Sequence, residues 1–599
     1  MPVLMQAVSS RGTEDFAPGW IALSDAEWES LPTDLPPHSE VVVTLCTGWQ
    51  ASECHVHHPA LIRLAGRSIV RGDEDWKQGW HSPLTQNMHF EEPVGAPGFG
   101  IYPPIVVFGP DGTGWLTGPT SEVASRCLWE WGPNKSGELV VTARLVPWGV
   151  DGESRSRRCE GWFLKHFQCE LAPSLFDSYN DAIARQLGLT PAQKNPDVGL
   201  TWATWNDGVF RDIDYDRIDA MCAWLARELP QVRWVQADDG WAGPAATIEN
   251  EDGTLGMSDF GVFYKPERLK GDPRFPGGMR AVADMMRRHG FRPALWITPA
   301  VMAGQPLYLE KPEWFLTEAR LNWMPEMRFL DFSRADVREF VEGALDLVFN
   351  EWGFEGTKLD FWTMTFEETN VRLSEDGPTA VEWMNWFLAQ IRRRIPDDGL
   401  MLHCIGLPFG GPWRSKYCDH FRYYADSEGS CGVQEMVREQ AVWAAYIAGL
   451  YGLTRFWGLN GDGFGLFDHI QLPADEHRRW AAFMLGSGST TELSGWLYRK
   501  ADHPGVPVVR TVAAHAALGS RIELPGYDYA ADPVLPPAVW LRLDRDGGRL
   551  IGICNWTDAH TDIPVPGSGM WRCVLTGQVV EGGQTVTVPP RDGLALVLA

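Results

Sequence analysis

Basic side chains are scarce in this chain of 599 residues, which has 52 Lys and Arg against 78 Asp and Glu and a formal net charge of -26. Proteins that bind nucleic acid or an anionic membrane neutralise phosphates with clustered basic groups. No run of Lys or Arg supplies such a cluster. The composition therefore argues against nucleic acid and membranes as partners.

Long apolar runs are also absent. No stretch approaches the ~20 apolar residues that a membrane-spanning helix needs, and the N-terminus lacks a basic segment followed by an apolar core. The 11 cysteines form no CxxC pair, which favours free thiols in a reducing compartment over a disulfide or zinc framework. We therefore expect a soluble, cytoplasmic protein. Because no GxxxxGK[ST] motif is present, we expect no nucleotide cofactor.

Tryptophan, in contrast, is abundant. The chain has 30 Trp residues, several-fold more than ordinary usage. Flat aromatic faces stack on the apolar faces of sugars, while polar neighbours bind the hydroxyl groups. Tryptophan also fills protein cores, so this excess only favours a carbohydrate ligand.

Three regions with different patterns follow one another along the chain. Short β-runs separated by turns, at 40–49, 60–70, 103–118, 137–148 and 161–171, predict an antiparallel β-sandwich between about residues 40 and 190. Strand-like and helical runs then alternate, as expected of a (β/α)8 TIM barrel. After residue 500 we find only strand-like runs, typical of a small antiparallel β domain. The predicted domains are therefore 1–190, 191–500 and 501–599.

Eight strand-like runs account for the predicted barrel. The connection between the fifth and sixth runs is too rich in Gly and Pro for a regular helix. TIM-barrel active sites lie at the carboxyl ends of the strands, so residues near those ends should converge on one mouth. The eight runs are 200–206, 233–241, 291–299, 356–362, 400–406, 421–427, 453–461 and 489–495.

Carboxylates and tryptophans dominate the residues near these strand ends. Glycoside hydrolysis requires two carboxyl groups that flank the scissile bond, polar groups that fix the hydroxyls, and an aromatic surface under the sugar ring. A single acid after a strand often only caps the next helix, but so many in one mouth favour a catalytic site. The residues are Trp205, Asp207, Asp238, Asp239, Trp241, Trp296, Lys358, Asp360, His403, Cys404, Arg422, Asp426, Trp457 and Asp462.

Six motifs between residues 234 and 461 carry a family resemblance. In chain order they are QADDGW, ALWITP, LDFSRADVREFV, GTKLDF, HCIG and RYYAD. Their order and spacing resemble the α-galactosidase clan, glycoside hydrolase families 27 and 36. The succession of β-sandwich, barrel and β domain is similar to family 36, whose members are often multimeric, so the resemblance implies a homo-oligomer.

The resemblance also implies a role for each matching residue. Asp360 would be the nucleophile of a retaining double displacement, and Asp426 would be the general acid and base. Hydroxyl groups of the sugar would be bound by Asp238 and Asp239 (O4 and O6), Lys358 (O3 and O4) and Arg422 (the O2 side). Cys404 and Gly406 would shape the space near O2. Among the tryptophans we expect Trp205, Trp241, Trp296 and Trp362 to bind substrate, with no metal and no cofactor.

Simple electrostatics predicts how the two acids divide their work. Lys358 lies two residues from Asp360, on the same face of a strand, and should lower the pKa of Asp360. The negative charge of Asp360 should then raise the pKa of Asp426, as an acid catalyst requires.

The bulky Phe361 and Trp362 depart from the family pattern, as do residues 405–408, so the sugar and the linkage stay open. The alternatives are an α-N-acetylgalactosaminide or a pentopyranoside as substrate, transfer to a sugar acceptor, or a carbohydrate-binding pseudoenzyme. His55 and His57 could pair on a metal, but no carboxylate accompanies them and we disfavour that reading.

Overall fold

A computed structural model describes most of the chain. The described residues are 2–9, 19–22, 34–35, 39–57, 98–100, 104–110, 112–120, 125–147, 157–158, 162–168, 171–189, 199–241, 248–249, 255–256, 273–317, 326–361, 372–404, 412–423, 426–427, 433–490, 492–517, 520–529 and 535–599.

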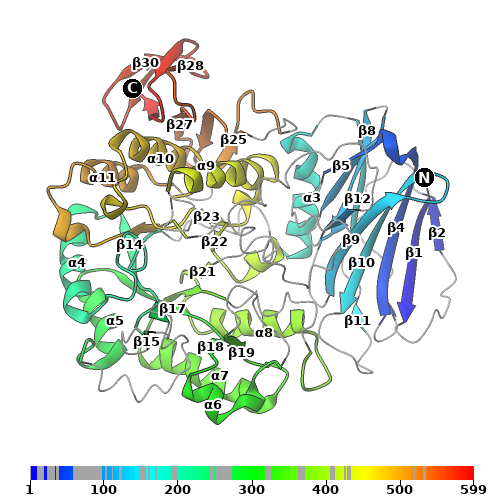
Figure 1. Cartoon of the computed structure of the whole chain (residues 1–599), viewed down its shortest axis with the longest axis horizontal. Helices are drawn as coiled ribbons and strands as arrows, with labels where there is room; N and C mark the ends of the chain where they lie inside the picture. Colours follow the sequence, from blue (N-terminus) through cyan, green and yellow to red (C-terminus); the bar gives the residue numbers. More distant parts are fainter. Residues whose placement is uncertain are drawn as a thin grey trace.

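Two antiparallel sheets form the N-terminal part, at one end of the molecule in Figure 1. Alternate residues of both sheets point inward and form one core, which includes Leu45, Val107, Trp129, Val141 and Leu164. The predicted β-sandwich is therefore confirmed. One sheet has the order β2 (Gly19–Ala22), β1 (Pro2–Ser9), β4 (Ser39–Gln50), β10 (Glu138–Pro147), β9 (Ser125–Pro133) and β6 (Gly98–Gly100); the other has β12 (Trp162–Gln168), β8 (Thr113–Pro119), β7 (Ile105–Phe108) and β5 (His55–His57).

The sequence alone missed several elements of this region. Strands β1, β2 and β9 lie outside the predicted β-runs, and helix α3 (Pro173–Gln186) lies where only strands were expected. The predicted run at 60–70 falls outside the described residues. Helix α3 connects the sandwich to the barrel, because Tyr179 Oη donates to the Pro119 carbonyl at 2.6 Å and Asn180 Nδ2 donates to the Tyr451 carbonyl at 2.7 Å.

Eight parallel strands form the central sheet; six lie within one of the eight predicted runs, and β14 and β22 each begin one residue before theirs. A parallel bridge between Phe464 and Leu493 brings the last strand beside the region that follows β23, so the sheet closes. The TIM barrel is therefore confirmed. In spatial order the strands are β23 (Gly458–Asn460), β22 (His420–Arg422), β21 (Met401–His403), β20 (Gly356–Leu359), β17 (Arg292–Ile297), β14 (Val232–Ala237), β13 (Leu200–Ala203) and β24 (Glu492–Ser494).

Amphipathic helices surround this sheet (Figure 1). Helix α4 buries Ile218, Met221, Cys222 and Leu225, as its apolar stripe predicts. Between β21 and β22 the described residues contain only the 3-10 turn Pro412–Lys416, in agreement with the Gly/Pro-rich sequence there. The helices are α4 (Tyr215–Glu228), α5 (Gly278–Arg288), α6 (Pro306–Glu310), α7 (Ala335–Asp346), α8 (Ala380–Arg392), α9 (Val433–Ala444), α10 (Ala474–Gly486) and α11 (Val506–His515).

Helix α11 corrects the expectation that only strands follow residue 500. Its residues Val506, Val509, Val512 and Ala513 are buried, and it begins after Gly505 with a proline in its first turn. As the helix after β24, it completes the eighth unit of the barrel. The predicted domain boundaries stay predictions. The strands beyond it are β25 (Arg521–Glu523), β26 (Val539–Leu543), β27 (Arg549–Cys554), β28 (Thr561–Pro564), β29 (Met570–Cys573), β30 (Val579–Glu581), β31 (Thr585–Val588) and β32 (Gly593–Leu598), all paired antiparallel.

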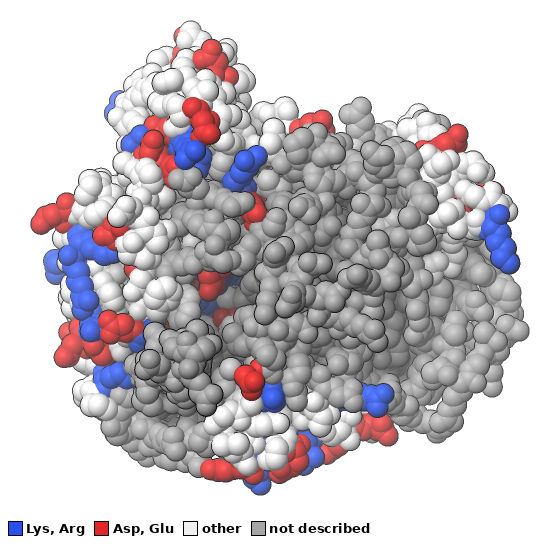
Figure 2. Space-filling model, viewed as in Figure 1, with Lys and Arg blue, Asp and Glu red and all other residues white. Residues whose placement is uncertain are grey.

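Within the described residues, no helix is both long enough and apolar enough to cross a membrane. On the face drawn in Figure 2, the described Lys and Arg side chains lie among Asp and Glu side chains.

Candidate active site

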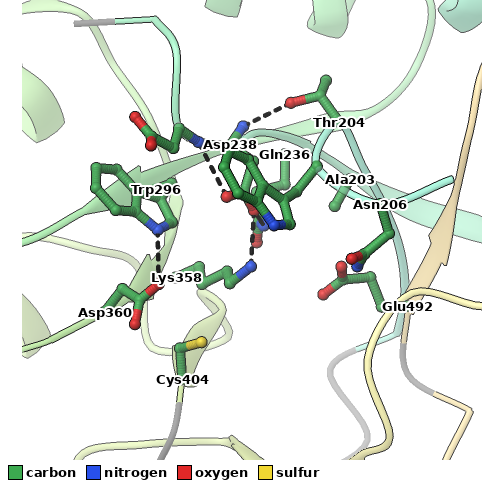
Figure 3. Close-up of polar contacts among 12 residues, drawn as sticks. Ala203, Thr204, Asn206, Gln236, Asp238, Trp296, Lys358, Asp360, Cys404 and Glu492 are labelled. Atoms are coloured by element: carbon green, nitrogen blue, oxygen red, sulfur yellow. Dashed lines mark hydrogen bonds and ion pairs between the residues drawn. The ribbon is translucent and has the colours of Figure 1, made fainter. Parts of the chain in front are cut away.

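A buried ion pair lies deep in the barrel, beneath its mouth. Lys358 Nζ, on β20, lies 2.9 Å from Asp238 Oδ2, just after β14, and both side chains are 2% exposed. Gln236 Nε2 donates to the same oxygen at 2.6 Å, and the Asp239 amide donates to Asp238 Oδ1 at 2.9 Å. Figure 3 shows the lysine reaching across from β20 toward Asp238. Because both charges are desolvated, either partner alone would be costly to bury.

Asp360 follows β20 directly and is also buried, with 8% of its surface exposed. The indole Nε1 of Trp296 donates to Asp360 Oδ2 at 3.1 Å (Figure 3), and the Phe361 amide donates to Oδ1 at 2.9 Å. Phe361 has a positive φ of 53°, which is uncommon for a residue other than glycine. This turn of the backbone aims an amide at the Asp360 carboxylate, and such strain is found most often at functional sites.

Asp426 follows β22, which β21 separates from β20, and its side chain is 44% exposed. It forms an ion pair with Arg422 Nη2, and Trp205 Nε1 donates to its Oδ2 at 3.3 Å. Arg422 Nη1 also donates to Cys404 Sγ at 3.2 Å. The strand ends of β13, β21 and β22 therefore meet at Asp426, as the predicted convergence requires.

The pKa values of the two acids differ from the sequence prediction. Burial raises the pKa of Asp360 to about 6; the charges of Lys358 and Arg422 lower it, and the charge of Asp426 raises it further. Lys358 lowers this pKa, as predicted, but burial outweighs the effect of its charge, so the expectation of a low pKa at Asp360 is wrong.

The prediction for Asp426 is also wrong in direction. Burial alone would raise its pKa, but the charges of Arg422 and Lys358, with hydrogen bonds from Arg422 and Trp205, lower it. In the free protein, the two carboxyls together therefore take up their first proton mainly on Asp360, at about pH 6.

Asp239, the second acid of the DDGW motif, pairs with other residues of the protein. Arg211 Nη2 lies 2.6 Å from Asp239 Oδ2, and the Gly240 amide donates to Oδ1 at 2.6 Å. Trp241 is fully buried, donates to the Trp296 carbonyl at 2.9 Å and meets Trp352 edge-on. Both residues support the wall of the mouth, and their contact with a sugar stays a prediction.

Cys404 and its neighbour His403 do not form a nucleophilic pair. Burial raises the pKa of the Cys404 thiol well above its usual range, and the thiol contacts Arg422. The ring of His403 instead meets Phe421, with 5.7 Å between ring centroids. The expectation that the two side chains point to opposite faces agrees with these contacts.

Two charged residues of the barrel interior were not assigned a role from the sequence. Glu492, on β24, is 1% exposed, and burial raises its pKa to about 7. Asp462, after β23, is also 1% exposed and lies 3.5 Å from Arg422 Nη1. Asp462 was noticed as a mouth residue, whereas Glu492 lies inside the predicted run 489–495 and could have been found by asking which strand residues are charged.

Several candidate residues cannot be placed. Trp362 and Gly406 lie outside the described residues. His55 and His57 lie in β5, which pairs with β7, but their side chains are not described. Among the described residues, one group has ligand atoms close enough for a metal: Asp207, Asp468 and His469. Lys500 Nζ lies 2.5 Å from Asp468 Oδ1 and 3.6 Å from Asp207 Oδ1, so a cationic side chain already neutralises this cluster.

Comparison with known proteins places this site in a family. Residues 182–385, which contain Asp238, Lys358 and Asp360, match the Melibiase family. The chain carries a melibiase domain. This confirms the resemblance drawn from the motifs, and the protein is a glycoside hydrolase of the α-galactosidase clan. No curated protein matches the chain by sequence.

Solved structures with the same fold include members of both families of the clan. The family 36 α-galactosidase AgaA of Geobacillus stearothermophilus aligns over 100% of this chain and 89% of its own, with a TM-score of 0.59 and 13% identity. The α-galactosidase of Lactobacillus brevis aligns over 95% of this chain and 77% of its own, at 0.58 and 12%. A family 27 β-L-arabinopyranosidase of G. stearothermophilus covers 68% of this chain and 97% of its own, at 0.50 and 15%. At these identities, the likeness to the solved structures shows a shared fold and nothing more.

Proposed function

We propose that this glycoside hydrolase is a retaining exo-enzyme that removes a terminal α-linked galactose or a closely related sugar. The observation that carries the proposal is the contrast between two carboxyl groups that follow β20 and β22, with only β21 between these strands. Asp360 is 8% exposed, whereas the side chain of Asp426 is 44% exposed. In a double displacement, the nucleophile attacks from within the sugar pocket, while the acid must be reached by the leaving group and later by water.

This contrast supports Asp360 as the nucleophile and Asp426 as the acid and base. With a pKa of about 6, Asp360 is about 90% ionised at pH 7, which a nucleophile needs. Asp426 must gain a proton before the glycosidic bond breaks. A bound sugar would exclude water from Asp426 and draw Arg422 toward its own hydroxyls, and both changes raise the pKa of Asp426.

The proposed reaction then has two steps. Asp360 attacks the anomeric carbon while the proton of Asp426 passes to the departing oxygen, which leaves a glycosyl ester on Asp360. Asp426, now ionised, takes a proton from water, and the resulting hydroxide opens the ester with net retention. The Trp296 indole would stabilise the Asp360 carboxylate as it leaves the sugar.

The sugar itself is proposed more broadly. Solved complexes of AgaA variants contain stachyose and raffinose, and a family 27 enzyme contains arabinose. We keep N-acetylgalactosamine and a pentopyranose as alternatives, because Phe361 lies beside the proposed nucleophile. The contacts of Lys358, Asp238, Asp239 and Cys404 with sugar hydroxyls belong to the same proposal.

A panel of nitrophenyl glycosides tests the proposal. We expect turnover of the α-galactoside, the α-N-acetylgalactosaminide or the β-L-arabinopyranoside, and none of the β-galactoside. Asp360→Asn and Asp426→Asn should each lose most of the activity, by about 100-fold or more. Full activity in either variant would refute the assignment, and sugar binding without any turnover by the wild type would favour a carbohydrate-binding pseudoenzyme.

A further inference from the structure

Asp462 lies in the barrel mouth without a role in the proposed reaction, although its surroundings are unusual. Its side chain is fully enclosed, with 1% of the residue exposed, and its φ is +70°. Non-glycine residues rarely adopt this conformation, and it persists only where the surrounding contacts enforce it. The contacts of both carboxylate oxygens show what this geometry achieves.

One oxygen of Asp462 holds the chain segment that carries Asp426. Asp462 Oδ2 accepts a hydrogen bond of 2.6 Å from the backbone amide of Ser427, the residue directly after Asp426. Ser427 is itself buried, with 0% exposure. The position of the Asp426 backbone is therefore tied to the loop that follows β23, not only to its own strand β22.

The other oxygen of Asp462 faces the guanidinium group that Asp426 uses. Asp462 Oδ1 lies 3.5 Å from Arg422 Nη1 and accepts a hydrogen bond of 2.8 Å from Asn206 Nδ2. Arg422 thus lies between two carboxylates, Asp462 on one side and Asp426 on the other. The charge of Asp462 partly neutralises Arg422 and so limits how strongly Arg422 holds the ionised form of Asp426.

Asp462 is in turn fixed from beneath. Its own amide donates to Asn460 Oδ1 at 2.6 Å, and Asn460 Nδ2 donates to Glu492 Oε2 at 3.2 Å. The charged groups that act on this network are Arg422, Asp426, Glu492, Lys358 and Asp238. Each contact of the Asp462 carboxylate is thus made by a buried donor, which is the arrangement expected of a fixed support.

We propose that Asp462 is a positioning residue for the general acid and base: it anchors the Ser427 amide and divides the charge of Arg422, so that Asp426 can take up a proton when substrate binds. The proposal rests on the proposed function of Asp426. It does not follow from the family motifs, because Asp462 lies in none of the six.

The test uses Asp462→Asn in the full-length protein. Asn tolerates a positive φ and keeps one acceptor for the Ser427 amide, but it removes the charge that faces Arg422. The value of kcat/KM for an alkyl glycoside, whose leaving group needs a proton, should fall by about tenfold or more. For a 2,4-dinitrophenyl glycoside, which leaves without a proton, it should fall by less than about threefold.

Asp419→Asn is the matched control. Asp419 is also a buried aspartate that accepts a backbone amide, from Met401 at 2.9 Å, and pairs with an arginine, Arg392 at 2.8 Å. It precedes β22 at the end opposite to the mouth, so its variant should keep the same ratio between the two substrates as the wild type. An equal loss on both substrates in Asp462→Asn would mean a merely structural role and would overturn the proposal.

A second variant covers the case in which Asp462→Asn does not fold. Asp462→Gly relieves the positive φ while removing the carboxylate. Its crystal structure should show Ser427 and Asp426 displaced from Arg422, and an unchanged position of both residues would overturn the proposal. This measurement needs no substrate, so its outcome is separate from a failure of the wild type on the glycoside panel, which would refute the proposed function instead.

Discussion

The hydrogen bond from the Trp296 indole to Asp360 should set the pH at which the pair of catalytic carboxyls titrates. Trp296→Phe keeps an aromatic ring in the buried wall and removes the Nε1 donor, which lies 3.1 Å from Asp360 Oδ2. A hydrogen bond to a charged group stabilises it by about 1.5–3 kcal/mol. Since 1.36 kcal/mol corresponds to one pKa unit, the pKa of Asp360 should rise by roughly 1–2 units.

Whether kcat/KM rises or falls with pH depends on which protonation state of the two carboxyls each substrate needs. A 2,4-dinitrophenyl glycoside needs only ionised Asp360, so its kcat/KM should rise with pH through about 6 in the wild type. An alkyl glycoside also needs one proton on the pair, so its kcat/KM should fall above the same pH. In Trp296→Phe both limbs should move together to higher pH, by roughly 1–2 units.

Trp457→Phe is the control for the loss of indole bulk. Trp457 is fully buried and stacks on Phe421 with 4.6 Å between ring centroids, and its Nε1 has no hydrogen-bond partner among the described residues. Its pH limbs should stay where the wild-type limbs are. If the limbs of Trp296→Phe stay at the wild-type position, or move to lower pH, then the pKa of Asp360 is not controlled as described.

Three further predictions concern stability and the thiol. Because the folded pKa of Asp360, about 6, is above its ordinary value of 3.8, its ionisation destabilises the fold as pH rises from about 4 to 6. Asp360→Asn should therefore gain about 2 kcal/mol relative to wild type at pH 7 compared with pH 4, as measured by denaturant unfolding. An equal difference at both pH values would contradict this. In Arg211→Ala the free energy of unfolding should fall by about 3–5 kcal/mol, because Asp239 is then buried without its cation. In the control Arg510→Ala, which breaks an exposed ion pair, it should fall by less than about 1 kcal/mol. Similar losses in both variants would show that the burial of Asp239 does not matter. Cys404→Ser should keep turnover within about tenfold of wild type, as measured by kcat, since the raised pKa of this thiol leaves it protonated, and complete loss would reopen a nucleophilic cysteine.

The sequence was sufficient to predict the barrel because its pattern is regular. All eight strands end within the predicted runs, and the apolar stripe of α4 is buried as expected. The sequence missed α11, where a β-branched run, Val506 to Val512, looks like a strand but carries a buried face at helical spacing. Packing of this face against the barrel favours the helix over the strand.

The candidate site was predictable in its membership but not in its electrostatics. Motif position brought Asp360, Asp426 and Arg422 to one mouth. Spacing along β20 suggested that Lys358 serves Asp360. Lys358 does lower the pKa of Asp360, but its direct partner is Asp238, which follows β14, two strands away in the sheet. Burial and cross-strand pairing determine both pKa values, and neither quantity can be read from the spacing of residues along one segment.

Azide rescue of two glycine variants tests the central claim, the division of roles between Asp360 and Asp426, most directly. With Asp360→Gly, azide should attack an activated glycoside in place of the nucleophile and give a glycosyl azide of the opposite anomeric configuration to the substrate. With Asp426→Gly, the ester on Asp360 still forms, and azide should open it to give the same configuration as the substrate. NMR of the two products therefore assigns the roles: the reverse pattern would exchange them, and no azide product from either variant would contradict the double displacement.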